Sequence, residues 1–215
     1  MDRNKLLNVI SKINRDSCPA KINFHCHTNF SDGSMHPDEL LNKAYKSNLK
    51  YLAITDHHSV SAHKHILKNR LLDNYPKDSI ELVSGIEISS VLNGCLVHLI
   101  GLGINIHSKS LIPYIKGEAA VGNNLKAKTV SLAIKDAGGV SILAHPARYR
   151  INYQTLIQNA KEEGIDGVEV WYDYELKEKW EASEFICESI DKLVDKYQML
   201  KSCGTDTHGY SLKGR

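Results

Sequence analysis

Two pairs of side chains that can bind a metal ion are each spaced two residues apart in this sequence. His25 and His27 flank a cysteine, and Asp206 and His208 flank a threonine. Both pairs follow short apolar runs that predict strands, and alternate residues of a strand point to the same face. Imidazole and carboxylate groups without thiolates are the donors that zinc, manganese, iron and similar divalent ions prefer. The two spacings therefore predict a metal site.

Further side chains of the same types end or follow other apolar runs. They are Asp32, Asp56, His57, Glu87, His98 and His145. Asp32 and Asp56 taken singly are also compatible with a turn and a helix cap. Together the donors exceed what one ion can bind, so we expect two to three divalent ions, Mn, Zn or Fe, with Glu87 as the carboxylate that bridges two of them. The other histidines, which we expect outside this cluster, are His36, His58, His63, His65 and His107.

The elements that must position these residues are apolar runs alternating with stretches of helical period, which is typical of repeated βα units. Strands are predicted over 21–24, 51–55, 81–88, 96–101, 140–144, 167–171 and 199–203. Helices are predicted over 37–47, 61–72, 118–137, 153–163 and 175–197. Parallel strands joined by helices form an open sheet or a closed barrel, and in both the carboxyl ends share one face, where ligands bind.

Composition favours one α/β domain over residues 1–215, because no linker, repeat or low-complexity tract interrupts the pattern. The net charge of +2 gives no electrostatic reason to expect duplex DNA or a membrane as partner. The absence of an apolar leader or span predicts a cytoplasmic protein, and five cysteines without a Cys-x-x-Cys pair predict reduced thiols. The oligomeric state stays open.

Six motifs in this order resemble the PHP (polymerase and histidinol phosphatase) family of metal-dependent phosphoesterases. They are residues 25–33 (His-Cys-His-Thr-Asn-Phe-Ser-Asp-Gly), 52–57 (Leu-Ala-Ile-Thr-Asp-His), 84–89 (Ser-Gly-Ile-Glu-Ile-Ser), 97–102 (Val-His-Leu-Ile-Gly-Leu), 142–149 (Ile-Leu-Ala-His-Pro-Ala-Arg-Tyr) and 204–208 (Gly-Thr-Asp-Thr-His). The resemblance implies a distorted seven-stranded (β/α)7 barrel, similar to a TIM barrel, with a trinuclear site. Carried over by motif, the three ligand sets are His25, His27, Glu87 and Asp206; Asp32, His57 and His208; and Glu87, His98 and His145.

Within the family, the sequence is most similar to the branch that removes phosphate from nucleoside 3',5'-bisphosphates, some members of which trim short RNA from its 5' end. That branch carries a helical cap insertion, and residues 115–137 predict a shortened version of it. The motif places Arg148 at the mouth of the cluster, where a guanidinium group can bind phosphate oxygens in a bidentate manner.

We therefore predict a phosphatase that hydrolyses a small phosphomonoester, of the nucleotide class, by metal-activated hydroxide. Its predicted catalytic residues are Glu87, Asp32 and His208. The proton donor to the leaving oxygen stays open between Asp32, His208 and His58. One alternative is a 5'-3' exonuclease on short RNA or DNA, with an aromatic groove; the candidates for that groove are Tyr149, Trp171, Tyr172 and Tyr174. The other alternative is an inactive binding module that is loaded with metal.

Overall fold

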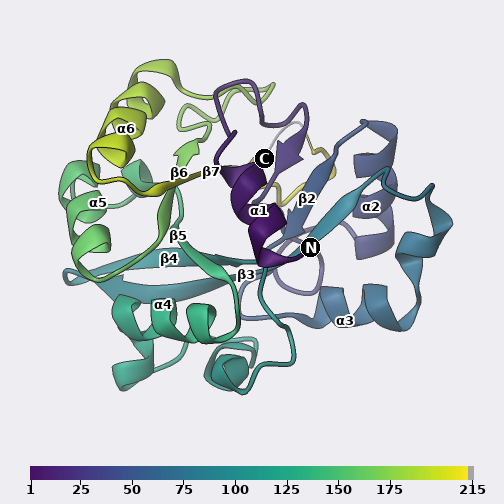
Figure 1. Cartoon of the computed structure of the whole chain (residues 1–215), viewed down its shortest axis with the longest axis horizontal. Helices are drawn as coiled ribbons and strands as arrows, with labels where there is room; N and C mark the ends of the chain where they lie inside the picture. The colour runs from purple at the N-terminus through teal and green to yellow at the C-terminus, as the bar shows by residue number, and fades with distance from the viewer. Residues whose placement is uncertain (213–215) are drawn as a thin grey trace.

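Seven strands in chain order form one curved sheet in the computed structural model, which describes residues 1–212 (Figure 1). The strands are β1 (Ile22–Asn23), β2 (Tyr51–Ile54), β3 (Glu81–Leu92), β4 (Cys95–Leu102), β5 (Val140–Leu143), β6 (Gly167–Trp171) and β7 (Leu200–Cys203). The ladder of paired strands ends at β1 and β7. Three backbone hydrogen bonds join these edges and the segments that follow them: Phe24 N to Cys203 O at 3.0 Å, Asp206 N to His25 O at 2.9 Å and His27 N to Thr207 O at 3.0 Å. The predicted seven-stranded α/β fold is confirmed.

The direction of β4 differs from the prediction of parallel strands. Strand β4 pairs antiparallel with both β3 and β5, while the remaining pairs are parallel. The reason is the tight turn at Asn93 and Gly94, whose φ angles of 49° and 71° are the left-handed values of a two-residue hairpin turn. Asn-Gly between apolar runs is a strong hairpin signal, and it makes the sheet mixed.

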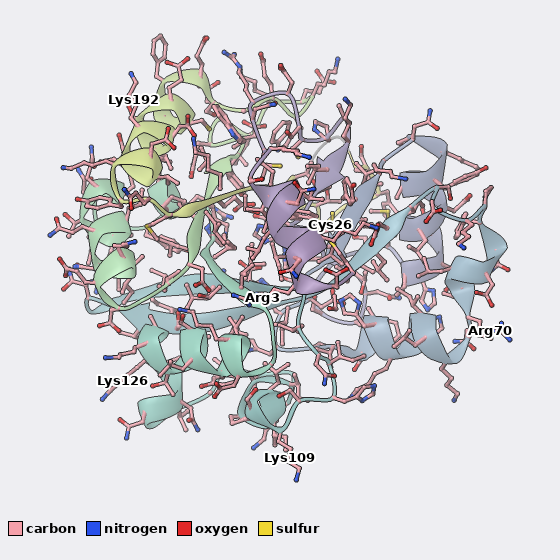
Figure 2. The ribbon with its side chains drawn as sticks, in the orientation of Figure 1. Arg3, Cys26, Arg70, Lys109, Lys126 and Lys192 are labelled. Carbon is pink, nitrogen blue, oxygen red and sulfur yellow. The ribbon has the colours of Figure 1, made fainter. Side chains whose placement is uncertain are left out.

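Helices cover the outside of the sheet. They are α1 (Arg3–Ile10), α2 (Pro37–Lys46), α3 (Ser61–Lys68), α4 (Ala127–Asp136), α5 (Tyr153–Glu162) and α6 (Glu184–Lys196), with short 3-10 turns η1 (Leu71–Asn74), η2 (Lys109–Tyr114), η3 (Gly122–Leu125) and η4 (Pro146–Arg148). The side chains of Arg70, Lys109, Lys126 and Lys192 point outward, whereas Cys26 lies in the interior (Figure 2). All five cysteines are buried and free.

Three predicted helices are markedly shorter in the structure: the helix expected over 61–72 ends at Lys68, and two others begin late. The helix expected over 118–137 begins only at Ala127, because Gly122 has a φ of 62° and Lys126 is extended. The helix expected over 175–197 begins at Glu184, because the Asp173 carboxylate accepts hydrogen bonds from the backbone amides of residues 175 and 177 and holds that segment as a loop. Both late starts come from side chains and glycines that favour turns over helix.

Helix α1, which the sequence patterns did not predict, crosses one end of the sheet (Figure 1). Its apolar face buries Leu6, Val9 and Ile10, and the Arg3 guanidinium donates to the carbonyls of Gly138 and Gly139, just before β5 begins. Helix α1 therefore covers the amino ends of the strands and leaves the carboxyl ends for the donors described below. Among residues 1–212, no helix has the length and apolarity to cross a membrane.

Candidate metal centre

The structure brings the nine predicted ligands together at the carboxyl-end face of the sheet. At this face lie three sets of side chains whose donor atoms are, within each set, no more than 4.8 Å from one another. We call them the inner group (His25, His27, Glu87, Asp206), the outer group (His27, Asp32, His57, His208) and the third group (His57, Glu87, His98). The inner group is buried, whereas the outer and third groups are partly open to solvent. The inner group thus lies at the buried bottom of the centre, and the outer and third groups lie at its solvent-accessible rim.

In the inner group, two carboxylate oxygens face two imidazole nitrogens. Glu87 Oε2 lies 3.0 Å from His25 Nε2 and 3.1 Å from His27 Nε2. Asp206 Oδ1 lies 3.3 Å from both nitrogens. The four atoms come from the ends of β1 and β7 and from the middle of β3. Four donors at these separations suit the compact coordination of a first-row divalent ion.

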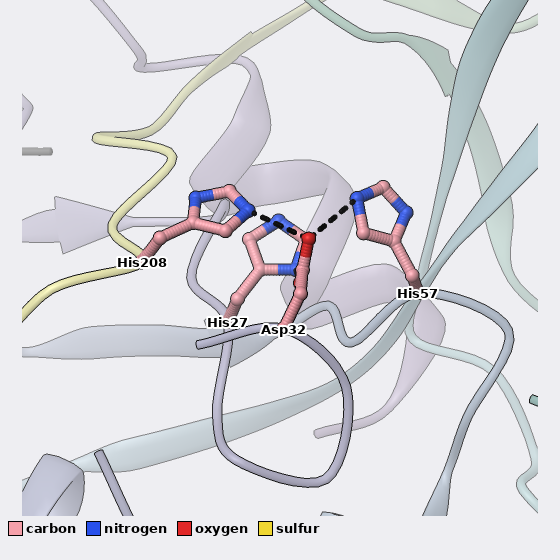
Figure 3. Close-up of side chains that lie close together, drawn as sticks. All are labelled: His27, Asp32, His57 and His208. Atoms are coloured by element: carbon pink, nitrogen blue, oxygen red, sulfur yellow. Dashed lines mark ion pairs between the residues drawn. The ribbon is translucent and has the colours of Figure 1, made fainter. Parts of the chain in front are cut away.

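The outer group surrounds the Asp32 carboxylate, which lies between two imidazoles (Figure 3). Asp32 Oδ2 is 3.2 Å from His208 Nε2 and 3.7 Å from His57 Nε2, and Asp32 Oδ1 is 3.4 Å from His27 Nδ1. The side chain of Asp32 is 52% exposed. An ion held here is reachable from solvent, so a substrate oxygen or water has access to it.

Glu87 also connects the inner group to the third group. Its second oxygen, Oε1, lies 3.0 Å from His98 Nδ1 and 3.4 Å from His145 Nε2, while His57 Nε2 is 3.5 Å from Oε2. His98 reaches this face because β4 runs antiparallel, which brings the middle of that strand, rather than its carboxyl end, beside Glu87. One carboxylate with imidazoles at both oxygens is the geometry of a bridging ligand.

Several buried side-chain nitrogen and oxygen atoms of the centre lie close to oppositely charged groups without making hydrogen bonds. Both ring nitrogens of His27 and Oε1 of Glu87 have no hydrogen-bond partner within residues 1–212, although oppositely charged atoms lie 3.0–3.4 Å away. Buried polar atoms normally make hydrogen bonds, because an unpaired one carries the full cost of desolvation. Donors that converge in this way fit a shared cation better than a shared proton. The residues present therefore fit divalent ions.

Electrostatics in the metal-free chain favour charged pairs. Burial by itself lowers the pKa of His27, but the carboxylates of Asp206 and Glu87 raise that pKa to about 9. Burial also opposes ionisation of Glu87, yet the His25 ring beside it holds the pKa of Glu87 well below its usual range. Burial lowers the pKa of His57 to about 4. Protons on the inner imidazoles must therefore leave when an ion binds.

Glu169 in β6 is a buried residue that the sequence analysis missed. Its carboxylate lies 3.0 and 3.2 Å from His25 Nδ1, and its Oε2 accepts a hydrogen bond from the backbone amide of His145 at 2.9 Å. An acceptor at Nδ1 keeps the proton on that nitrogen and leaves the Nε2 lone pair for a cation. The available signal was a lone glutamate inside the apolar run Gly-Val-Glu-Val-Trp.

Hydrogen bonds to the Asp56 carboxylate hold the loop that carries Asp32. The Asp56 carboxylate accepts hydrogen bonds from the amide of Thr28 at 2.6 Å, the hydroxyl of Thr28 at 2.7 Å and the hydroxyl of Ser31 at 2.8 Å. Gly33 completes the loop, since a Cβ at that position would lie 2.5 Å from the carbonyl carbon of His27. Asp56 therefore anchors the loop rather than capping a helix.

Asp206 is held by two further groups at the rim. Its Oδ2 accepts hydrogen bonds from the Tyr172 hydroxyl at 2.7 Å and from Arg148 Nη1 at 2.9 Å. The backbone of Asp206 has a φ of 52°, a left-handed value that few residues other than glycine adopt. The hydrogen bond from the Asp206 amide to the His25 carbonyl and these side-chain contacts stabilise that conformation. Arg148 therefore lies at the mouth of the centre, with its side chain 36% exposed.

The aromatic residues proposed for a nucleic-acid groove lie elsewhere than on an open surface. Trp171 and Tyr172 are buried, and the hydroxyl of Tyr149 accepts a hydrogen bond from the backbone amide of His98 at 2.8 Å. Trp171 and Tyr172 therefore offer no exposed face for stacking, and the prediction was wrong for these two; Tyr149 and Tyr174 are partly buried, and their part in a groove stays a prediction. His58 is also buried, with Nε2 3.1 Å from the Ser89 hydroxyl, and its part in proton transfer stays a prediction.

Two curated relatives are exoribonucleases. The chain is 27% identical over 145 residues to a 5'-3' exoribonuclease of Haemophilus influenzae, across 61% of this chain and 50% of that protein. It is 35% identical over 82 residues to the 5'-3' exoribonuclease Rnm of Escherichia coli, across 38% of this chain and 27% of that protein. The chain thus spans half or less of the length of these relatives.

Solved structures with low sequence identity share the fold. An amidohydrolase from Chromobacterium violaceum with bound sulfate superposes with a TM-score of 0.73 at 19% identity, over 91% of this chain and 90% of that one. An inferred metal-dependent phosphoesterase from Bifidobacterium adolescentis gives 0.69 at 20% identity, over 91% of both chains. The family model described as the PHP domain matches residues 23–205. Because this match covers most of the sequence and includes seven of the nine predicted ligands, the chain belongs to the PHP domain family.

Proposed function

We propose that this chain is a metal-dependent phosphoesterase that hydrolyses a small phosphomonoester of the nucleotide class. The observation that carries the proposal is the junction at Glu87, where one buried carboxylate faces imidazoles from both of its oxygens. The eight ligands of the three groups, together with His145, would hold two to three divalent ions, which we expect to be Mn, Zn or Fe. Bound ions of this kind lower the pKa of water and neutralise phosphate oxygens.

The buried and the exposed residues of the centre have different proposed roles. At the buried end, Glu169 fixes His25 and the backbone of His145, and the Tyr172 hydroxyl fixes Asp206. The outer group is exposed, so Asp32 and His208 are the residues placed where a substrate can approach. They stay the candidates for moving a proton to the leaving oxygen.

Arg148 is the proposed phosphate-binding residue. Its guanidinium contacts Asp206 and Tyr172 through Nη1, and a third of the side chain is exposed at the rim. A planar group with five N–H donors can bind a carboxylate with one nitrogen and phosphate oxygens with others. This placement supports binding of a charged terminal phosphate next to the outer group.

A second candidate function is 5'-3' exoribonuclease activity on short RNA. The observation that favours it is the sequence similarity to the two exoribonucleases, each of which this chain matches only in part. The burial of Trp171 and Tyr172 counts against it, because an exposed stacking platform is the usual way to bind single strands. We therefore rank it below the phosphomonoesterase.

The experiment compares two substrates with the same purified protein in the presence of manganese. One substrate is a nucleoside 3',5'-bisphosphate, with released phosphate as the readout, and the other is a short RNA labelled at its 3' end. Phosphate release with intact RNA supports the phosphomonoesterase, whereas stepwise shortening of the RNA from its 5' end supports the exoribonuclease. Glu87→Gln must lose either activity, and Glu178→Gln, a change at an exposed loop residue, must keep it. No turnover of either substrate or of an aryl phosphate would leave a binding module.

A further inference from the structure

A second cluster of potential metal ligands lies apart from the three groups of the candidate metal centre. It consists of His36, Asp38 and His65, whose donor atoms lie within 4.8 Å of one another. His36 directly precedes α2, Asp38 is in the first turn of α2, and His65 is on α3. Because α2 and α3 lie side by side (Figure 1), the cluster connects two neighbouring helices. We call it the α2–α3 cluster.

The three side chains of the α2–α3 cluster share one carboxylate oxygen. Asp38 Oδ2 lies 3.1 Å from His65 Nε2 and also contacts His36 Nδ1. The two imidazole rings meet edge to face, with their centroids 4.7 Å apart. Phe30 packs against both rings, at centroid distances of 5.8 Å and 5.7 Å. Ring packing on two sides restricts both imidazoles, so their nitrogens are already directed at the carboxylate before any ion binds.

Two imidazoles and one carboxylate are a donor set that zinc, iron and related divalent ions accept, with water completing the coordination. The side chains are 41%, 46% and 26% exposed for His36, Asp38 and His65, which gives an ion a path from solvent and leaves room for water ligands. A cation next to the first turn of α2 is disfavoured by the helix dipole, but Asp38 and Glu39 in that turn supply two negative charges.

Asn69 contacts the ring nitrogen of His65 that points away from Asp38. Its Nδ2 lies 3.2 Å from His65 Nδ1. Binding of an ion at Nε2 leaves the ring proton on Nδ1, so the Asn69 amide must turn and present its oxygen to that proton. The positions of the amide oxygen and nitrogen are assigned from their hydrogen-bond partners. Rotation of the Asn69 amide would replace its present hydrogen bond to the His65 carbonyl with one from the His65 ring.

We propose that the α2–α3 cluster binds one divalent transition-metal ion of the zinc type, in addition to the ions of the candidate metal centre. This inference is independent of the proposed function, because it uses none of the ligands of the three groups. The ion would also affect the centre at a distance. Phe30 and His36 flank Asp32 in the chain, so an ion that joins His36 to His65 would fasten the His36 end of that loop to α3, with Phe30 packed against both rings.

The test counts zinc in the full chain. Wild type, the double variant His36→Gln/His65→Gln and the control His107→Gln, which changes an exposed histidine outside the cluster, are dialysed against the same free zinc concentration and analysed for metal content. We expect wild type and His107→Gln to retain one equivalent more than the double variant. The difference does not depend on how many ions the centre binds, because all three proteins share that centre.

A single change at the carboxylate separates ligand loss from misfolding. Asp38→Asn keeps both imidazoles and the shape of the side chain, and we expect its zinc affinity at this site to fall at least about tenfold in calorimetric titration. Circular dichroism must show all variants folded. Zinc should also slow amide hydrogen exchange in residues 28–36 of wild type more than in the double variant. Equal zinc content in wild type and double variant would overturn the proposal, and equal exchange would overturn the fastening of the loop.

Discussion

Replacing Glu169 is the sharpest test of how the candidate metal centre is held. Glu169 contacts no atom of the outer group, yet its two oxygens accept hydrogen bonds from the ring of His25 and from the backbone of His145. In Glu169→Gln one carbonyl oxygen remains, and at the Oε2 position it still accepts from the His145 amide at 2.9 Å. An NH2 group then takes the Oε1 position 3.0 Å from His25 Nδ1, so the His25 ring faces a donor and keeps only its longer 3.2 Å contact with Oε2. The change removes a hydrogen bond and a charge without removing volume.

We expect Glu169→Gln to lower both the folding free energy and the metal affinity. One buried donor without a partner costs about 1–3 kcal/mol of folding free energy. Loss of the group that orients a ligating histidine typically lowers metal affinity or activity by about 10- to 100-fold. Because His25 Nε2 lies 3.0 Å from Glu87 and 3.3 Å from Asp206, a shift of its ring disturbs the whole inner group. We expect weaker metal binding at the inner group first.

The assay is a manganese titration by calorimetry, together with thermal unfolding of the metal-free and loaded protein. Glu178→Gln, at an exposed position, serves as the control for the loss of one negative charge. A merely structural role predicts equal destabilisation of both forms and unchanged metal affinity. If Glu169→Gln binds manganese as tightly as wild type, the argument that Glu169 orients His25 is refuted.

Three further predictions follow from the centre. Residues that hydrogen-bond to metal ligands typically change activity by about 10- to 100-fold when they are replaced, and Glu87 is itself an expected ligand. We therefore expect Glu87→Gln to lower turnover, measured by phosphate release, by more than about 100-fold. Near-normal turnover would contradict a bridging role. Arg148→Ala should raise KM more than it lowers kcat in steady-state kinetics, and an unchanged KM would remove Arg148 from substrate contact. Metal-free protein should be most stable near pH 6.5 in thermal unfolding with a chelator. Between pH 4 and 6.5 the unfolded chain binds more protons at His57, so stability rises with pH; between pH 6.5 and 9 the folded chain binds more at His27, so stability falls. Each effect amounts to about 3 kcal/mol, and a steady rise up to pH 9 would disprove it.

Local pattern predicted the strands and the donors well because both depend on residues close in sequence. The alternation of apolar runs placed each predicted strand within a few residues of an observed one. The spacing of His25 and His27 put both rings on one face, as the contacts of their Nε2 atoms with Glu87 show. Most of the nine expected ligands gather because they follow strand ends, whereas Glu87 and His98 lie in the middle of their strands; the binding of metal by all nine stays a prediction.

Sequence patterns alone misjudged the segments where a turn competes with regular structure. The Asn93-Gly94 hairpin reverses β4, and the reversal is why His98 meets Glu87 from the middle of its strand. The helix starts at Ala127 and Glu184 were also misplaced, because a single glycine or a carboxylate that accepts backbone hydrogen bonds ends the helical pattern.

The sequence by itself determined the types of donor in this protein, their spacing along the chain and the α/β class, since these follow from side-chain chemistry and backbone periodicity. Only the tertiary structure decided which oxygen of Glu87 faces which ring, that Glu169 lies behind His25, and that His36, Asp38 and His65 meet on the surface. The reason is physical: those contacts join residues from separate elements, and their geometry depends on how the whole chain packs.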